Sequence, residues 1–148
     1  MKKIFIGSDH AGFELKQKLK EHLSETEYNI EDVGPEIYDK SDDYPDYALP
    51  LAQKVKANNG LGILLCGNGI GVCIAANKVE GVRAGTATDE WMAKTMREDD
   101  STNVLCLPAR KLEEKEATNI VDTWLNTDFT GAKRHKRRIN KIKNFEQQ

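Results

Sequence analysis

Short apolar runs alternate along the chain with segments in which apolar residues recur every three or four positions. The first run, at 3–7, precedes a segment in which Ala11, Leu15, Leu19 and Leu23 repeat at helical spacing. Further strand-like runs lie at 28–33, 61–65, 82–87 and 104–107. Helical patterns lie around 44–55, 71–78, 89–97 and 113–125, and a last helix is expected from about 135. The pattern predicts five strands separated by helices.

This alternation indicates a fold class. Strands separated by helices of about 10 to 15 residues form βαβ units with right-handed crossovers. The run at 61–65 carries no charge, as a strand covered on both faces of a parallel sheet requires. We therefore predict an α/β fold, a three-layer α/β/α sandwich with a doubly wound, five-stranded parallel sheet. The length of 148 residues suits a single domain over 1–148.

Composition excludes several classes of protein. With 39% hydrophobic and 31% charged residues, the chain is too apolar for a disordered segment and too polar for a membrane protein. Its N-terminus lacks the pattern of a secretory signal, and its three cysteines form no C-x-x-C motif. We expect a cytoplasmic protein with reduced thiols, no structural zinc and no membrane partner.

Positive charge is concentrated at the C-terminal end. Residues 131–148 carry seven Lys and Arg against one Glu, although the whole chain has a net charge of -2. A basic helix of this kind could bind nucleic acid, form a solvated face or hold a small anion. Arg134 and Arg138 lie one helical turn apart, a spacing that suits two guanidinium groups on one phosphate. The charge pattern alone leaves these alternatives open.

Two loops that follow predicted strands carry candidate chemistry, because ligands of parallel sheets bind outside the carboxyl ends of the strands. Asp9 and His10 place a carboxylate beside an imidazole after the first strand, although Asp9 could equally cap the next helix. The second loop, 66–71, reads Cys-Gly-Asn-Gly-Ile-Gly. Its alternating glycines suit either a tight turn or backbone N–H groups that converge on an anion or oxyanion.

The spacing of this second loop bears on dinucleotide binding. A dinucleotide fingerprint would read G-x-G-x-x-G after the first strand, whereas this loop reads G-x-G-x-G after the third, so dinucleotide binding is disfavoured. Cys66 opens the loop at the end of a strand, where a helix N-terminus favours a thiolate. We expect a reactive role for Cys66 and core roles for Cys73 and Cys106.

With these residues the chain resembles the ribose-5-phosphate isomerase B family, which also includes galactose-6-phosphate isomerase subunits. The resemblance covers nearly the whole chain. It is carried by residues 7–16, 43–48, 62–67, 74–78 and 102–105, together with Arg134, His135 and Arg138. It implies aldose–ketose interconversion of a sugar phosphate through a cis-enediolate, with no metal or organic cofactor. It also implies a homodimer with active sites at the subunit interface, or a tetramer, and no nucleic-acid partner.

The resemblance also implies roles for individual residues. Cys66 would be the general base that moves a proton between C1 and C2, and Asn68 with the following loop would stabilise the enediolate. The residues expected to contact the substrate are Asp9, His10, Gly67, Gly69, Gly71, Asn77 and Asn103. The residues expected to bind its phosphate are His10, Arg110, Arg134 and Arg138.

The chain departs from the family pattern at two positions. Asn68 stands where family members commonly have Thr or Ser, and Asp99 stands where they usually have the His that opens the furanose ring. A carboxyl group with an ordinary pKa of about 3.9 is a poor acid at neutral pH. Asp99, His10, His135 or water would then open the ring of ribose 5-phosphate. Alternatively, the substrate is a tetrose 4-phosphate, allose 6-phosphate or galactose 6-phosphate, or the protein binds sugar phosphates with little turnover.

Overall fold

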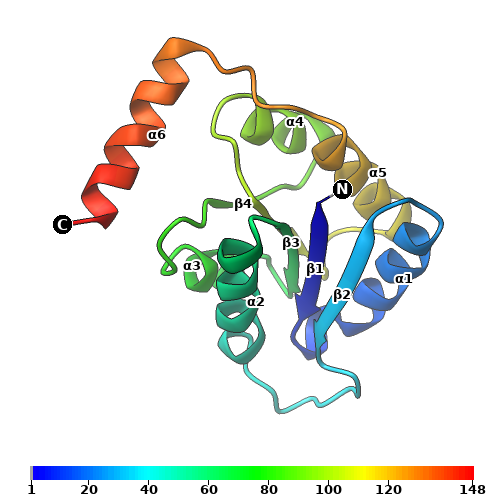
Figure 1. Ribbon diagram of the computed structural model, residues 1–148. Coiled ribbons are helices and arrows are strands. Elements are labelled where there is room, and N and C mark those ends of the chain that lie inside the picture. The colour runs from blue at the N-terminus through cyan, green and yellow to red at the C-terminus, as the bar shows by residue number, and fades with distance from the viewer. Residues whose placement is uncertain (1) are drawn as a thin grey trace.

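In the computed structural model, which describes residues 2–148, a parallel sheet is covered by helices on both faces (Figure 1). Its strands are β1 (Lys3–Ser8), β2 (Asn29–Gly34), β3 (Leu61–Cys66), β4 (Ala84–Thr86) and β5 (Val104–Pro108). They lie in the order β2-β1-β3-β5-β4, and every neighbouring pair is parallel. The predicted α/β fold with five parallel strands is confirmed.

The helices follow the predicted segments with small differences. They are α1 (Phe13–Ser24), α2 (Pro45–Asn58), α3 (Gly71–Ala76), α4 (Glu90–Glu98), α5 (Glu114–Leu125) and α6 (Lys133–Glu146). Ala11 lies outside α1, in a 3₁₀ turn that Asp9 caps by accepting hydrogen bonds from the N–H groups of Ala11 and Gly12. The capping interpretation of Asp9 is therefore confirmed. None of the helices in the described part of the chain is long and apolar enough to cross a membrane.

Side chains of the central strands alternate between two hydrophobic clusters, one on each face of the sheet. Ile63 and Leu65 pack in the cluster that α1, α4 and α5 cover, whereas Leu64 and Cys66 pack in the cluster beneath α2 and α3. All six residues of β3 are buried. The uncharged run at 61–65 therefore reflects burial on both faces, as a parallel sheet with two helical layers requires.

The connections between strands reverse direction at the centre of the sheet. From β1 the chain passes through α1 to β2 on one side, and then through α2 to β3 on the other side of β1 (Figure 1). In open α/β sheets such a reversal leaves a crevice outside the carboxyl ends of the strands. The fold thus brings the segments that follow β1, β3 and β5 to one edge.

A buried ion pair fixes the loop that leads from β2 toward this edge. Lys16 of α1 is fully buried, and its Nζ lies 2.8 Å from Oδ1 of Asp32 and 2.7 Å from the carbonyl oxygen of Pro35. Burial lowers the pKa of Lys16, and the contact with Asp32 partly opposes this. Burial would raise the pKa of Asp32, but hydrogen bonds from Lys16, Lys20 and the N–H of Gly34 hold it below its ordinary value.

We expect Asp32→Asn to lower the free energy of unfolding by about 3 kcal/mol, because a buried ammonium loses its counter-charge. Glu31 is the matched control on the same strand, since its more exposed carboxylate binds Lys3 and Lys54. Glu31→Gln should cost less than about 1 kcal/mol. Urea unfolding measures the free energy of unfolding of both variants. Equal losses of this free energy would contradict a special role for the buried Lys16–Asp32 pair.

The same ion pair predicts a direction for acid unfolding. Because the pKa of Asp32 is lower in the folded chain than its ordinary value of 3.8, its contribution to stability is complete above that value. The contribution is lost as the pH falls through the folded pKa. Asp32→Asn should therefore unfold with a weaker dependence on pH in this acidic range than the wild type.

Candidate functional site

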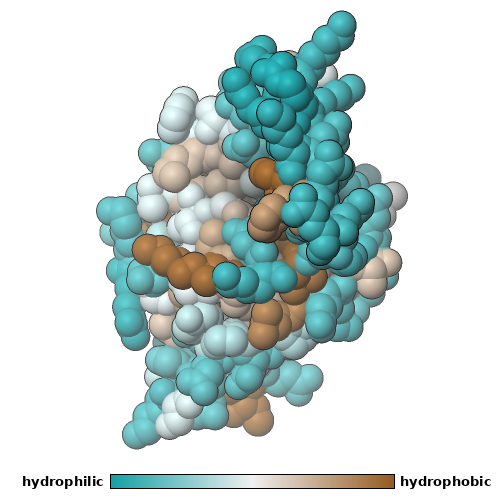
Figure 2. Space-filling model, turned by 90° about the vertical axis from the view of Figure 1, so that its left-hand side faces the viewer, coloured by the Kyte–Doolittle hydropathy of each residue, from teal (hydrophilic) through white to brown (hydrophobic). Residues whose placement is uncertain are grey.

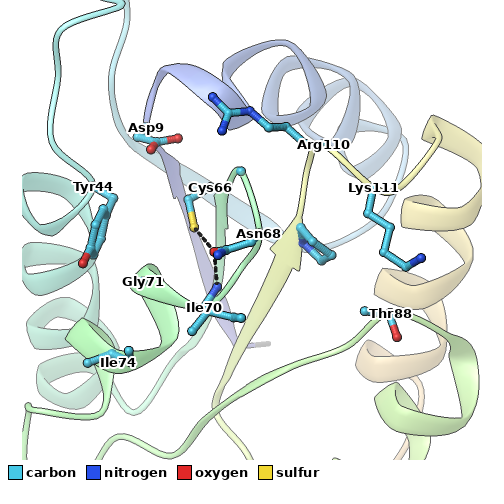
Figure 3. Close-up of a pocket in the computed structure, with 12 residues that line it drawn as sticks. Asp9, Tyr44, Cys66, Asn68, Ile70, Gly71, Ile74, Thr88, Arg110 and Lys111 are labelled. Carbon is cyan, nitrogen blue, oxygen red and sulfur yellow. Dashed lines mark hydrogen bonds between the residues drawn. The ribbon is translucent and has the colours of Figure 1, made fainter.

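A cleft of about 700 Å³ opens at the carboxyl ends of β1, β3 and β5 (Figure 3). Of the predicted site residues, those on its wall are Asp9, Cys66, Gly67, Asn68, Gly71 and Arg110. In Figure 3 the guanidinium group of Arg110 extends toward Asp9, above the thiol of Cys66. The cleft therefore combines a thiol, a carboxylate and a cation that come from the ends of three different strands.

Cys66 is the last residue of β3 and is almost completely buried. Its thiol donates a weak hydrogen bond to Oδ1 of Asn68 over 3.8 Å. The same oxygen accepts the N–H of Ile70 at 2.9 Å (Figure 3). Asn68 therefore shapes the loop and contacts the thiol at the same time. The carbonyl oxygen of this one side chain performs both tasks.

Glycine is required in this loop for two separate reasons. Gly69 has φ +73°, in the left-handed region, and a Cβ there would lie 2.9 Å from the carbonyl carbon of Leu107. A Cβ on Gly71 would lie 2.6 Å from the ring of Tyr44. The loop consequently passes close to β5 on one side and to the start of α2 on the other.

Contacts with neighbouring loops hold Arg110 and His10 in place at or beside the cleft. The N–H of Arg110 donates to the carbonyl oxygen of Gly67 at 3.0 Å, which ties the end of β5 to the loop after β3. His10 follows Asp9, but its side chain lies beside the cleft and not on its wall. Its backbone N–H and its Nδ1 both contact Oδ1 of Asp42. The candidate phosphate ligand His10 is therefore held by the loop after β2.

Comparison with known proteins identifies the family. The family described as Ribose/Galactose Isomerase matches residues 4–142. The chain belongs to this family. It is an isomerase by that membership, and the resemblance seen in the sequence is confirmed.

Individual relatives match over nearly their whole length. A probable ribose-5-phosphate isomerase B of Mycoplasma genitalium is 48% identical over 147 residues, which cover 98% of this chain and 96% of that protein. The crystal structure of the Mycoplasma genitalium enzyme with bound ribulose-5-phosphate has a TM-score of 0.96, at 48% identity, and the match covers 99% and 97% of the two chains. Ribose-5-phosphate isomerase B of Clostridium thermocellum has a TM-score of 0.94 at 42% identity, with 98% and 97% covered.

Two asparagines that the family resemblance placed in the site lie away from the cleft of their own chain. Asn77 follows α3, and its amide accepts the N–H of Ala84 at 2.8 Å and donates to the carbonyl oxygen of the same residue at 3.0 Å. Asn103 accepts the N–H of Arg83 and donates to the carbonyl oxygen of Gly81. Both side chains hold the segment before β4, at the amino edge of the sheet. Within one chain both amides therefore have a structural role, and their contact with the substrate stays a prediction.

Three further predicted residues lie away from the cleft of their own chain. Asp99 ends α4, and its Oδ1 lies 3.3 Å from Nε2 of His135 on α6. Arg134 and Arg138 are exposed on α6, which projects from the body of the molecule (Figure 1). Within one chain of this isomerase these groups do not meet Cys66.

The other two cysteines differ from each other. Cys106 is completely buried, as the predicted core role requires, and burial raises the pKa of its thiol. Cys73 is only partly buried, and its Sγ lies 3.4 Å from the carbonyl oxygen of Ala84. A hydrogen bond with Cys106 lowers the pKa of Cys73, while burial opposes this and Thr86 adds to it. The predicted core role therefore holds fully for Cys106 alone.

Several residues on the cleft wall were not among the predicted site residues. They are Tyr44, Ile70, Ile74, Thr88, Pro108 and Lys111. Thr88 lies just after β4, so the rule that placed Asp9 at the edge of the sheet would also have found it. Tyr44 precedes α2 and reaches the cleft because Gly71 leaves room for its ring. That contact could not be anticipated from spacing along the chain.

Proposed function

We propose that this chain interconverts ribose 5-phosphate and ribulose 5-phosphate. The observation that carries this proposal is the cleft, in which a carboxylate and a guanidinium lie close together above a thiol at the carboxyl edge of the sheet. The near-identical fold of the Mycoplasma genitalium enzyme with bound ribulose-5-phosphate supports the choice of substrate. A pocket of about 700 Å³ has room for a pentose phosphate.

In the proposed reaction Cys66, as thiolate, removes the proton from C2 of the open-chain aldose. The electron pair of the broken C–H bond forms the C1–C2 double bond, and the carbonyl oxygen at C1 takes the negative charge of a cis-enediolate. Transfer of the proton on O2 to O1, and return of the first proton from Cys66 to C1, give the ketose and regenerate the thiolate. Asn68, Gly67 and Gly71 line the cleft with the thiol, and Gly69 shapes the loop between them, so that fixed dipoles there can stabilise charge as it develops.

The rest of the substrate requires polar and cationic partners. Asp9 on the cleft wall is suited to accept hydrogen bonds from sugar hydroxyls, and Arg110 supplies a positive charge. We propose that Arg134 and Arg138 bind the phosphate, together with His10, and that Asp99 reaches the site from a second copy of the chain. This arrangement needs no metal or organic cofactor, so turnover should be unchanged by a chelator.

Exposed apolar side chains support a homodimer with active sites shared between subunits. Ile142 and Phe145 on α6 are 53% and 72% exposed, and Ile70 and Ile74 beside the cleft are 53% and 56% exposed. Figure 2 shows hydrophobic side chains gathered on one face within a hydrophilic border. Burial of this surface against a second copy would stabilise a dimer. A tetramer would bury more of the same exposed apolar surface between copies.

One observation favours a different substrate for the same chemistry. Asp99 replaces the usual ring-opening His, and a tetrose phosphorylated on O4 cannot close a furanose ring, so it would not need that residue. Allose 6-phosphate and galactose 6-phosphate are further candidate substrates. Asp99→His should accelerate turnover of ribose 5-phosphate if ring opening limits the rate, and an unchanged rate would argue against that limitation.

The proposed function is tested by a turnover assay on four sugars. Ribose 5-phosphate, erythrose 4-phosphate, allose 6-phosphate and galactose 6-phosphate are compared at equal concentration, with and without chelator. We expect the highest kcat/KM for ribose 5-phosphate. A higher kcat/KM for another sugar would identify that sugar as the substrate of the same reaction. Binding without turnover would indicate a sugar-phosphate-binding protein.

A further inference from the structure

One carboxylate oxygen holds the imidazole of His10 in place. Oδ1 of Asp42 accepts the backbone N–H of His10 at 2.9 Å and lies 2.7 Å from Nδ1 of its ring. The two residues are 32 positions apart in the chain. The ring of Tyr38 packs edge-on against the imidazole, with 6.4 Å between the centroids. The orientation of this ring is therefore set by two separate groups from the loop after β2.

The burial of Asp42 shows that this contact is more than a surface ion pair. Its side chain is 5% exposed, although it lies on a loop. Its second oxygen, Oδ2, is buried with no hydrogen-bond partner within 3.5 Å among residues 2–148. The phenol of Tyr47 lies nearby, and burial together with the Asp42 carboxylate raises the pKa of Tyr47. Burial of a carboxylate in this way costs free energy, so a buried oxygen without a close partner calls for a specific explanation, such as a functional role. The loop is also anchored at its start, where Lys16 binds the carbonyl oxygen of Pro35.

We propose that Asp42 is a positioning residue that keeps Nδ1 of His10 protonated and thereby presents Nε2 to the sugar phosphate. An ionised carboxylate can only accept a hydrogen bond, so the hydrogen between the two atoms belongs to Nδ1. The partner of one ring nitrogen thus decides what the other can offer. This inference rests on the proposed function, because it gives His10 its substrate-binding role at the margin of the cleft.

The other two histidines provide a natural contrast. His22 and His135 contact Asp122 and Asp99 through Nε2, at 2.8 and 3.3 Å. Those carboxylates are 46% and 48% exposed, against 5% for Asp42. Only His10 is paired through Nδ1, and only its partner is buried, among the histidines of the described chain. Asp122 is therefore a matched control for Asp42.

Nitrogen NMR of the imidazole rings tests the arrangement without any substrate. We expect neutral His10 in the wild type to carry its hydrogen on Nδ1, and we expect Asp42→Ala to return it to the Nε2–H form that predominates in free imidazole side chains. Asp122→Ala should leave the His10 signals unchanged. An Nε2–H form of His10 in the wild type, or an unchanged form in Asp42→Ala, would overturn the proposal.

Kinetics test the consequence for the substrate. Asp42→Ala should lower kcat/KM for ribose 5-phosphate by about 10- to 100-fold, as is typical when the partner that orients a functional imidazole is removed. Asp42→Asn keeps an acceptor oxygen for both contacts and should recover most of this loss, while Asp122→Ala should match the wild type. Full turnover by Asp42→Ala would overturn the proposal. A wild type inactive on ribose 5-phosphate would instead reject the proposed function, and the NMR result would still decide the state of His10.

If Asp42→Ala fails to fold, the inference remains testable through the wild type and Asp42→Asn. The wild-type spectrum alone shows whether Nδ1 carries the hydrogen. Asp42→Asn retains the shape of the side chain and removes its charge. Loss of the Nδ1–H form in a folded Asp42→Asn protein that keeps wild-type kcat/KM would show that the position of this hydrogen does not matter, and would overturn the proposal.

Discussion

Cys66→Ala should lower kcat for ribose 5-phosphate by about 100- to 10,000-fold, the usual contribution of a positioned general base. The thiol lies at the carboxyl end of β3, on the wall of the cleft, with Asn68 as its hydrogen-bond acceptor. The groups proposed to bind the substrate stay in place in this variant. KM should therefore change much less than kcat, which can be measured by following the formation of ribulose 5-phosphate.

Two further variants separate proton transfer from packing. Cys66→Ser fills most of the same volume but offers a hydroxyl, which is a far weaker base than a thiolate, so it should lose nearly as much activity as the alanine variant. Cys73→Ser is the control, because Cys73 is a partly exposed thiol on α3 that does not line the cleft. It should turn over close to the wild-type rate. Near-normal activity in both Cys66 variants would assign proton transfer to another group.

The edge of the sheet that carries the cleft could be predicted from the sequence. Runs of strand residues followed by helical spacing indicated a parallel sheet, and the carboxyl ends of its strands meet at one edge. Asp9, Cys66 and Arg110 follow β1, β3 and β5 in this way, and the structure brings all three to the same cleft. To predict that these three residues lie close together, only the direction of each strand had to be known.

The same rule explains why Asn77 and Asn103 lie away from the cleft of their own chain. Asn77 follows a helix and Asn103 precedes a strand, so the direction of the chain puts both at the amino edge of the sheet. The family resemblance placed them in the site without regard to this direction. Their amides instead satisfy backbone groups of the segment before β4, as partly buried backbone requires.

The contact between His10 and Asp42 could not be predicted from local pattern. It depends on the course of the loop after β2, which Lys16 anchors at Pro35. Neither hydrophobic periodicity nor turn residues specify how such a loop crosses the surface. Local pattern therefore indicates His10 as a candidate but not the carboxylate that orients it.

The position of α6 gives the second large expected effect. The double variant Arg134→Ala, Arg138→Ala should lower kcat/KM for ribose 5-phosphate at least about 100-fold, because each hydrogen bond to a charged group contributes about 1.5–3 kcal/mol. Both side chains are exposed and lie outside the cleft of their own chain. If they bind phosphate in the cleft of a second copy, each active site takes Cys66 from one chain and both arginines from the other.

Mixing of inactive variants distinguishes a shared site from a site within one chain. In a mixed dimer of Cys66→Ala with the double arginine variant, one site carries both defects and the other is intact. Equal mixing with free exchange of subunits should therefore restore about a quarter of wild-type activity. Cys66→Ala mixed with Arg110→Ala is the control, since these residues line the same cleft and every mixed site keeps one defect. Activity no greater than the sum of the separate variants would place the phosphate site within a single chain. The positive charge of α6 would then have to serve a different purpose.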